Sequence, residues 1–142
     1  MCHYCKIVSG ELPASVVYED EYTLAFLVIK PVTPGHVVVI PKKHVASFAE
    51  LSDVGASDLI HAVKRVDQAI KASDLTCEAI SIYLGDGERA GQEIPHIHVH
   101  VFPRFSEDQF TINFDTELIR HRSIAELEGD AQKIREGFKR IR

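Results

Sequence analysis

The sequence predicts a mixed fold built from five strands and two main helices. Five short segments rich in apolar and β-branched residues are typical of strands. Two longer segments carry apolar residues at steps of three and four, the period of an amphipathic helix. The chain has 142 residues, is 45% hydrophobic and shows no internal repeat, so 1–142 is expected to fold as a single domain.

The first three strands lie in the N-terminal third of the chain. Segments 16–19 and 22–29 flank an acidic turn and predict a hairpin. Segment 30–35 contains two prolines and a glycine, which interrupt any strand ladder. A third strand is predicted at 36–40.

A helix, two further strands and a second helix complete the pattern. A helix is predicted over 58–73, followed by strands at 77–84 and 97–104 that are joined by a glycine-rich loop. The second helix opens with Ser123 and Glu126, which form the sequence pattern of a capping box. The apolar positions of the first helix are Leu59, Val63, Val66 and Ile70.

Charge and hydropathy exclude two classes of partner. Sixteen basic and 21 acidic residues give a formal charge of −5, which argues against a general nucleic-acid binder. The longest apolar run, Leu24–Ile29, is far shorter than the roughly 18 residues that span a membrane. No basic segment leads into an apolar one at the N-terminus, so no secretory signal is visible and a cytoplasmic location is expected.

Three histidines alternate with apolar residues at His96, His98 and His100. On a strand these side chains share one face, with about 7 Å between successive positions. Three titratable rings at this spacing have no packing rationale, so they indicate a functional site. Either all three imidazoles bind a metal ion, or one acts as nucleophile or base while the others position substrate or a structural metal.

Two of the three cysteines form a Cys2-x-x-Cys5 pair. Two thiolates supply half of a tetrahedral zinc site, and His44 and His96 are candidates for the other two ligands. A redox pair or two free thiols is the alternative. Cys77 stands alone in an apolar stretch and is expected to be a small core residue.

The sequence resembles the histidine triad (HIT) family of nucleotidyl hydrolases and transferases, in its zinc-containing branch. The similarity covers about 2–104 and leaves 105–142 as a helical extension. Its landmarks are segments 2–13, 18–21, 24–26, 31–36, 39–44, 90–92 and the alternating signature 96–102.

The resemblance implies an α+β fold with a five-stranded antiparallel sheet, paired across a twofold axis into a ten-stranded homodimer. It also implies that His98 attacks the α-phosphorus of a nucleotide and forms a covalent nucleotidyl-histidine, which water then hydrolyses. The implied substrate is a nucleoside phosphoramidate or a dinucleoside polyphosphate.

Further roles follow from the same resemblance. His100 and His36 would contact phosphate or help the leaving group, and Gln92 with the backbone at Gly91 would hold the α-phosphate oxygens. Structural zinc would be held by Cys2, Cys5, His44 and His96. The nucleobase would lie among Tyr4, Ile7, Leu12, Phe26 and Ile29.

Two positions depart from the family pattern. Val28 stands where the family commonly has an acidic residue or Asn that binds the ribose hydroxyls, and Gly85 stands where it usually has Asn or Gln near the phosphates. The loss of one hydrogen bond to a hydroxyl costs about 1 kcal/mol. A non-catalytic nucleotide sensor or dimeric scaffold is therefore a second hypothesis, and a hydrolase with one catalytic ion on His96, His98 and His100 is a third.

Overall fold

The computed structural model describes residues 2–113 and 120–141. It divides into two compact units, one within 1–110 and the other within 111–142. Residues 114–119 and 142, which belong to the predicted extension 105–142, lie outside the described residues. The prediction of one domain over 1–142 stays a prediction.

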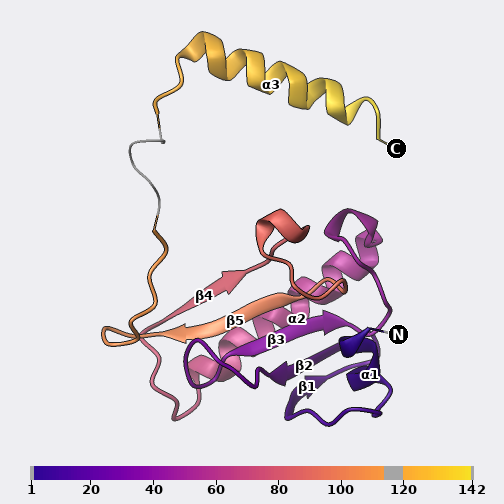
Figure 1. Ribbon diagram of the computed structural model, residues 1–142, viewed down its shortest axis with the longest axis vertical. Helices are drawn as coiled ribbons and strands as arrows, with labels where there is room; N and C mark the ends of the chain where they lie inside the picture. The colour runs from indigo at the N-terminus through magenta and orange to yellow at the C-terminus, as the bar shows by residue number, and fades with distance from the viewer. Residues whose placement is uncertain (1, 114–119, 142) are drawn as a thin grey trace. The chain divides into compact units, whose positions relative to one another are not determined.

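The first unit contains a five-stranded sheet in the order β1-β2-β3-β5-β4 (Figure 1). All neighbouring strands pair antiparallel, which confirms the predicted sheet. The strands are β1 (Val16–Glu19), β2 (Thr23–Leu27), β3 (Val37–Pro41), β4 (Ala79–Tyr83) and β5 (Val99–Arg104).

Four strands lie inside the predicted segments, and β3 ends at Pro41, one residue beyond the predicted 36–40. Differences of two residues occur at the end of β2, at the start of β4 and at the start of β5, which was predicted from residue 97 and begins at Val99. The reason at β5 is a backbone contact outside the sheet, because the Ile97 N–H donates to the Val45 carbonyl at 2.7 Å. His96 and His98 therefore precede the strand, in a segment attached to the loop after β3.

Helix α2 (Asp53–Lys71) covers one face of the sheet (Figure 1). Its predicted start at residue 58 is five residues late, because Ser52 caps the helix by accepting the Gly55 N–H at 3.0 Å. The core on this face consists of Ala25, Val37, Val39, Val99 and Val101 from the sheet and Leu59, Ala62, Val63, Val66 and Ile70 from α2.

A short helix that the sequence did not predict, α1 (His3–Val8), lies on the other face of β2 and β3. Cys2 caps it, since its thiol accepts the Cys5 N–H at 3.3 Å. Helix residues Tyr4, Ile7 and Val8 pack against a second, smaller cluster formed by Leu24, Phe26, Val38 and Ile40.

The second unit contains α3 (Ile124–Phe138), and the predicted capping box between Ser123 and Glu126 is present. Two 3₁₀ turns, η1 (Phe48–Glu50) and η2 (Glu88–Ala90), lie in the loops of the first unit. None of the helices in the described ranges is long and apolar enough to cross a membrane.

Candidate active site and metal centre

The signature histidines lie on the same face of the sheet as α1. His100 pairs with Val38 across β3 and β5, and Val38 belongs to the cluster that α1 covers. The His98 and His100 rings are perpendicular neighbours with their centroids 5.0 Å apart. The structure thus places both rings side by side, next to the N-terminal helix.

His98 is buried and oriented by the backbone. Its Nδ1 lies 2.8 Å from the His96 carbonyl oxygen, which can only accept, so Nδ1 carries the proton. Burial lowers the pKa of His98 below its usual value, and the neutral ring keeps a lone pair on Nε2. The neutral ring therefore has an unprotonated Nε2, which is the form in which an imidazole can act as a nucleophile.

A second backbone group sets the tautomers of His36 and His100. The Val32 N–H donates to His36 Nδ1 at 3.1 Å, so the proton of the neutral His36 ring sits on Nε2. His36 Nε2 then donates to His100 Nδ1 at 2.9 Å, which places the His100 proton on its own Nε2. Burial, with a smaller effect of the neighbouring His100, lowers the pKa of His36 to about 4.

Gln92 uses its side-chain amide to hold the glycine-rich loop. Its Oε1 accepts the Gly87 N–H at 2.7 Å, while its Nε2 donates to the carbonyls of Ala46 and Ile94 at 2.7 and 3.1 Å. These contacts fix the backbone on both sides of the loop. The predicted contact of Gln92 with phosphate stays a prediction.

Two of the three glycines in this loop, Gly85 and Gly91, are required by the shape of the loop. A Cβ at Gly85 would lie 2.5 Å from the Ala90 carbonyl oxygen, so a side chain does not fit there. Gly91 has a φ of 89°, in the left-handed region that favours glycine. The absence of a polar side chain at Gly85 therefore follows from the close approach of the loop to itself.

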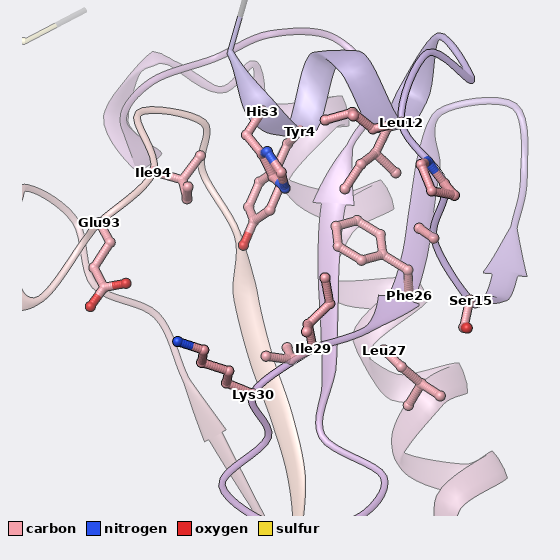
Figure 2. Close-up of a pocket in the computed structure, with 14 residues that line it drawn as sticks. His3, Tyr4, Leu12, Ser15, Phe26, Leu27, Ile29, Lys30, Glu93 and Ile94 are labelled. Atoms are coloured by element: carbon pink, nitrogen blue, oxygen red, sulfur yellow. The ribbon is translucent and has the colours of Figure 1, made fainter.

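An apolar pocket of about 790 Å³ opens between α1, the end of β2 and the segment before His96 (Figure 2). It contains all six predicted nucleoside contacts on α1, β2 and their following loops, but neither Gly85 nor Gly91. Tyr4 joins this pocket to the histidines, since its ring meets those of Phe26 and His98 edge-on at 5.4 and 5.2 Å. The six are Tyr4, Ile7, Leu12, Phe26, Val28 and Ile29.

The pocket also has lining residues that the sequence did not predict. Lys30 and Glu93 bring charges to its wall, and Ile94 adds apolar surface. Glu93 and Ile94 lie between the predicted residues Gln92 and His96, and Lys30 follows Ile29 directly. Their position next to predicted site residues in the sequence was the only available signal. The remaining lining residues are His3, Pro13, Ala14, Ser15 and Leu27.

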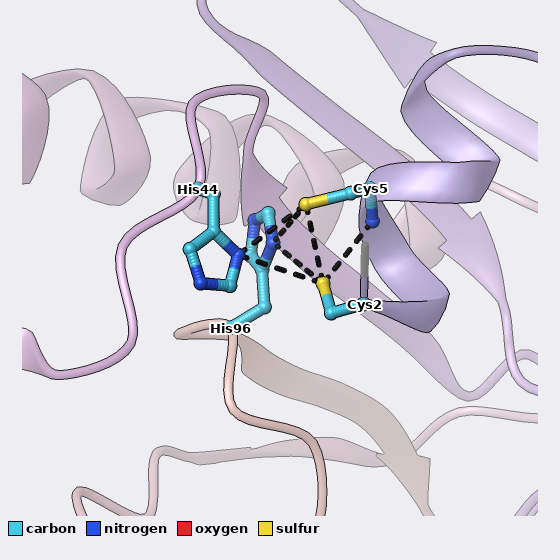
Figure 3. A group of neighbouring side chains, drawn as sticks. All are labelled: Cys2, Cys5, His44 and His96. Atoms are coloured by element: carbon cyan, nitrogen blue, oxygen red, sulfur yellow. Dashed lines mark hydrogen bonds between the residues drawn. The ribbon is translucent and has the colours of Figure 1, made fainter.

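The four predicted metal ligands meet at the N-terminus of α1 (Figure 3). One ligand atom from each of Cys2, Cys5, His44 and His96 lies within 4.8 Å of all the others. The four distances from a sulfur to a histidine Nδ1 are 3.3 to 3.6 Å, and the two sulfurs lie 3.2 Å apart. Tetrahedral zinc with these ligands would place nitrogen and sulfur about 3.5 Å apart. The sulfur-to-nitrogen spacing fits this geometry.

A backbone acceptor prepares His96 for this cluster. Its Nε2 lies 2.7 Å from the Pro41 carbonyl oxygen, so Nε2 carries the proton and Nδ1 is free to bind a metal. Four protein ligands complete a tetrahedron and leave no open position, as in structural zinc sites. Since Nδ1 of His98 is bonded to a carbonyl, the described residues do not favour one ion shared by the three signature histidines.

Comparisons with known proteins agree with this arrangement. The HIT domain model matches residues 9–107. A solved HIT family protein from Bacillus subtilis superposes with a TM-score of 0.86 at 34% identity, covering 95% of each chain. A Zn-bound histidine triad protein from Mycobacterium smegmatis superposes with a TM-score of 0.74 at 37% identity, covering 80% of this chain and 82% of that one.

A relative with a named activity also matches. The adenosine 5'-monophosphoramidase hnt1 of Schizosaccharomyces pombe is 38% identical over 107 residues, which are 75% of this chain and 77% of the relative. The matched region includes most of the first unit and the signature histidines. The chain belongs to the histidine triad family, and its Cys2, Cys5, His44 and His96 cluster supports the zinc-containing branch.

Proposed function

We propose that this protein cleaves a nucleoside phosphoramidate or a dinucleoside polyphosphate through a covalent nucleotidyl-histidine at His98. The observation that carries the proposal is the hydrogen bond from His98 Nδ1–H to the His96 carbonyl, beside an apolar pocket. This bond leaves the Nε2 lone pair for attack, and no group of the described residues hydrogen-bonds to that atom. A neutral imidazole held in this way is an effective nucleophile near neutral pH.

The first step forms a bond between His98 Nε2 and the α-phosphorus, while the bond from phosphorus to the leaving nitrogen or oxygen breaks. The leaving atom takes the Nε2 proton of a protonated His100, which returns to its neutral ring. In the second step water attacks the phosphorus, His100 accepts a water proton, and the bond to His98 breaks. Two displacements avoid free hydroxide in the difficult step.

The nucleoside class is supported by the pocket and by the relatives. Apolar side chains from α1 and β2 form a surface that suits a flat base. Two yeast relatives are adenosine 5'-monophosphoramidases. We therefore place the base among Tyr4, Ile7, Leu12, Phe26 and Ile29, with the phosphate at His98.

We also propose that Cys2, Cys5, His44 and His96 hold a structural zinc ion. The ion would act as a cross-link between α1 and the segment before β5, and no step of the reaction passes through it. His96 would then hold the metal with its Nδ1 and orient His98 with its carbonyl. The cytoplasmic location, which suits free thiols, stays a prediction.

A homodimer with a ten-stranded sheet is part of the same proposal. Strand β4 forms one edge of the sheet and exposes Ile82 and Tyr83 by 54% and 46%. Exposed apolar residues on an edge strand favour pairing with a second strand. Light scattering on the purified protein is expected to give the mass of two chains, and the mass of one chain would contradict the dimer.

A catalytically weak sensor or scaffold is the second candidate. It is favoured by Val28, which lines the pocket without a group that could accept a hydrogen bond from ribose. In that case AMP would bind with measurable affinity and no substrate would turn over.

His98→Ala tests the proposal. We expect the variant to lose release of AMP from adenosine phosphoramidate and from diadenosine polyphosphates, because the nucleophile is absent. The matched control is His61→Ala, since His61 is exposed on α2 and remote in sequence from the site. Full activity of the His98 variant would contradict the assignment of His98 as the nucleophile. AMP binding by an inactive wild type would favour the sensor.

A further inference from the structure

Two opposite charges face the apolar pocket from different walls. Glu93 lies in the segment before His96, and Lys30 follows the end of β2. Figure 2 shows the Glu93 carboxylate and the Lys30 ammonium directed toward the same end of the pocket, where the Tyr4 hydroxyl also points. The rest of the lining is mostly apolar, so these groups provide most of its polarity.

The backbone that carries Glu93 is anchored on both sides. The Gln92 side chain bonds to the Ile94 carbonyl and to the backbone of Ala46 and Gly87. The carboxylate itself is exposed, and no hydrogen bond or ion pair holds it within 2–113 and 120–141. Because the backbone of Glu93 is anchored and its carboxylate has no partner among the described residues, the negative charge is available to a ligand.

Glu93 lies three residues before His96 in the sequence and lines the same pocket as Tyr4, whose ring meets that of His98 at 5.2 Å. Burial dominates the pKa of His98 and of His100 and lowers both, while the negative charge of Glu93 acts in the opposite direction on each. Burial raises the pKa of Tyr4 to about 12, and Glu93 adds to this effect. One carboxylate therefore acts electrostatically on three rings around the site.

A negative charge at this position treats the two substrate classes differently. When a bond from phosphorus to nitrogen breaks, the leaving amine takes a proton and departs as a neutral amine or an ammonium ion. When a polyphosphate leaves, it departs with several negative charges. A nearby carboxylate attracts the first kind of leaving group and repels the second.

We propose that Glu93 is a specificity-determining residue that favours phosphoramidates with amine leaving groups over dinucleoside polyphosphates. The inference rests on the proposed function, because it concerns the choice between that function's two substrate classes. Lys30 lies on the opposite wall, after β2, and is assigned no part in this choice.

The test compares Glu93→Gln with wild-type protein on two substrates. One is an adenosine phosphoramidate whose amine carries an ammonium group, and the other is a diadenosine polyphosphate. We expect the ratio of their kcat/KM values to fall roughly tenfold in the variant, and the difference to shrink at high salt. A ratio within twofold of wild type would overturn the proposal.

Glu88→Gln is the matched control. It removes the same charge from an exposed position in the glycine-rich loop, outside the pocket lining. The control is expected to keep the wild-type ratio. An equal fall in both variants would mean that net charge, and not the position of Glu93, decides the preference, which would also overturn the proposal.

A binding measurement tests Glu93 without turnover. Calorimetry on the folded, zinc-loaded proteins would compare AMP with adenosine, which differ by the phosphate. We expect Glu93→Gln to improve the affinity for AMP severalfold and to leave that for adenosine unchanged. Unchanged AMP affinity would overturn the role of Glu93. Absence of turnover in the wild type would instead overturn the proposed function, while the binding result still decides on Glu93.

Discussion

The two faces of the sheet are stabilised in different ways. Nineteen residues of α2 cover one face, and five of them are buried in a continuous apolar core. Six residues of α1 cover part of the other face, and none of them is fully buried. The proposed chemistry lies on the second face, where Cys2 and Cys5 connect α1 to His44 and His96. Apolar packing of α2 therefore stabilises one face, whereas the proposed site on the other face depends on the cluster of four candidate metal ligands.

The largest expected effect comes from a change in the α2 face. Leu59 is completely buried in the core between α2 and the sheet. Leu59→Ala is expected to lower the free energy of unfolding by about 2–5 kcal/mol, because it leaves a cavity. Denaturant titration measures this loss. Bound zinc and nucleotide affinity in the folded fraction should stay at wild-type levels, and their loss would mean that the two faces are not separate.

The complementary change removes a ligand from the α1 face. Cys5→Ser is expected to abolish zinc binding and weaken AMP binding roughly tenfold or more, because α1 carries Tyr4 and Ile7 of the pocket. Metal analysis and calorimetry measure the two effects. Cys77→Ser is the control, since Cys77 lies outside the cluster. Wild-type AMP affinity in a zinc-free Cys5 variant would contradict the proposed role of zinc as a cross-link between α1 and the segment before β5.

The pH dependence of stability offers a third, smaller effect on the same face. Burial and the neighbouring His100 lower the pKa of His36 to about 4 in the folded protein, against about 6.5 when unfolded. Between these pH values the unfolded chain binds more protons than the folded protein. The contribution of neutral His36 to the free energy of unfolding is therefore complete above pH 6.5 and is lost as the pH falls toward 4.

Thermal unfolding of the wild type and His36→Gln between pH 7 and 4 measures this contribution. The wild type is expected to lose about 3 kcal/mol more than the variant over this range. Acid release of zinc affects both proteins and cancels in the comparison. Parallel curves for the two proteins would show that His36 is not held neutral.

The smallest effect concerns Tyr4, where ring and hydroxyl can be separated. The ring contacts Phe26 and His98, and edge-on aromatic contacts contribute about 1 kcal/mol each. Tyr4→Ala removes one aromatic contact with the proposed base, about 1 kcal/mol, and is expected to weaken adenosine binding about fivefold, whereas Tyr4→Phe keeps the ring and should bind like wild type. Calorimetry distinguishes them, and an equal loss in both would assign the contact to the hydroxyl.

The features that the sequence predicted are those with a local signal. The five strands, the amphipathic core of α2 and the capping box at Ser123 each follow from spacing or composition within a short segment. The metal cluster was predictable because Cys2 and Cys5 have the spacing of zinc ligands and His44 and His96 were candidates for the other two positions, to which the family resemblance then assigned them.

The features that were missed depend on contacts between distant segments. Helix α1 is too short for a periodic pattern, and Cys2 is not a common capping residue. The start of β5 depends on the Val45 carbonyl, and the tautomer of His36 depends on the Val32 N–H. No sequence pattern reports such backbone bonds. The position of Glu93 in the pocket wall likewise required the folded loop.

In the proposed reaction His98 carries the nucleotide as a covalent intermediate. Rapid quenching of the wild type with excess adenosine phosphoramidate, followed by intact mass and peptide mapping, tests it most directly. We expect a transient mass increase of one AMP group, mapped to His98 and absent in His98→Ala. Steady release of AMP with no adduct, or an adduct on another residue, would contradict it.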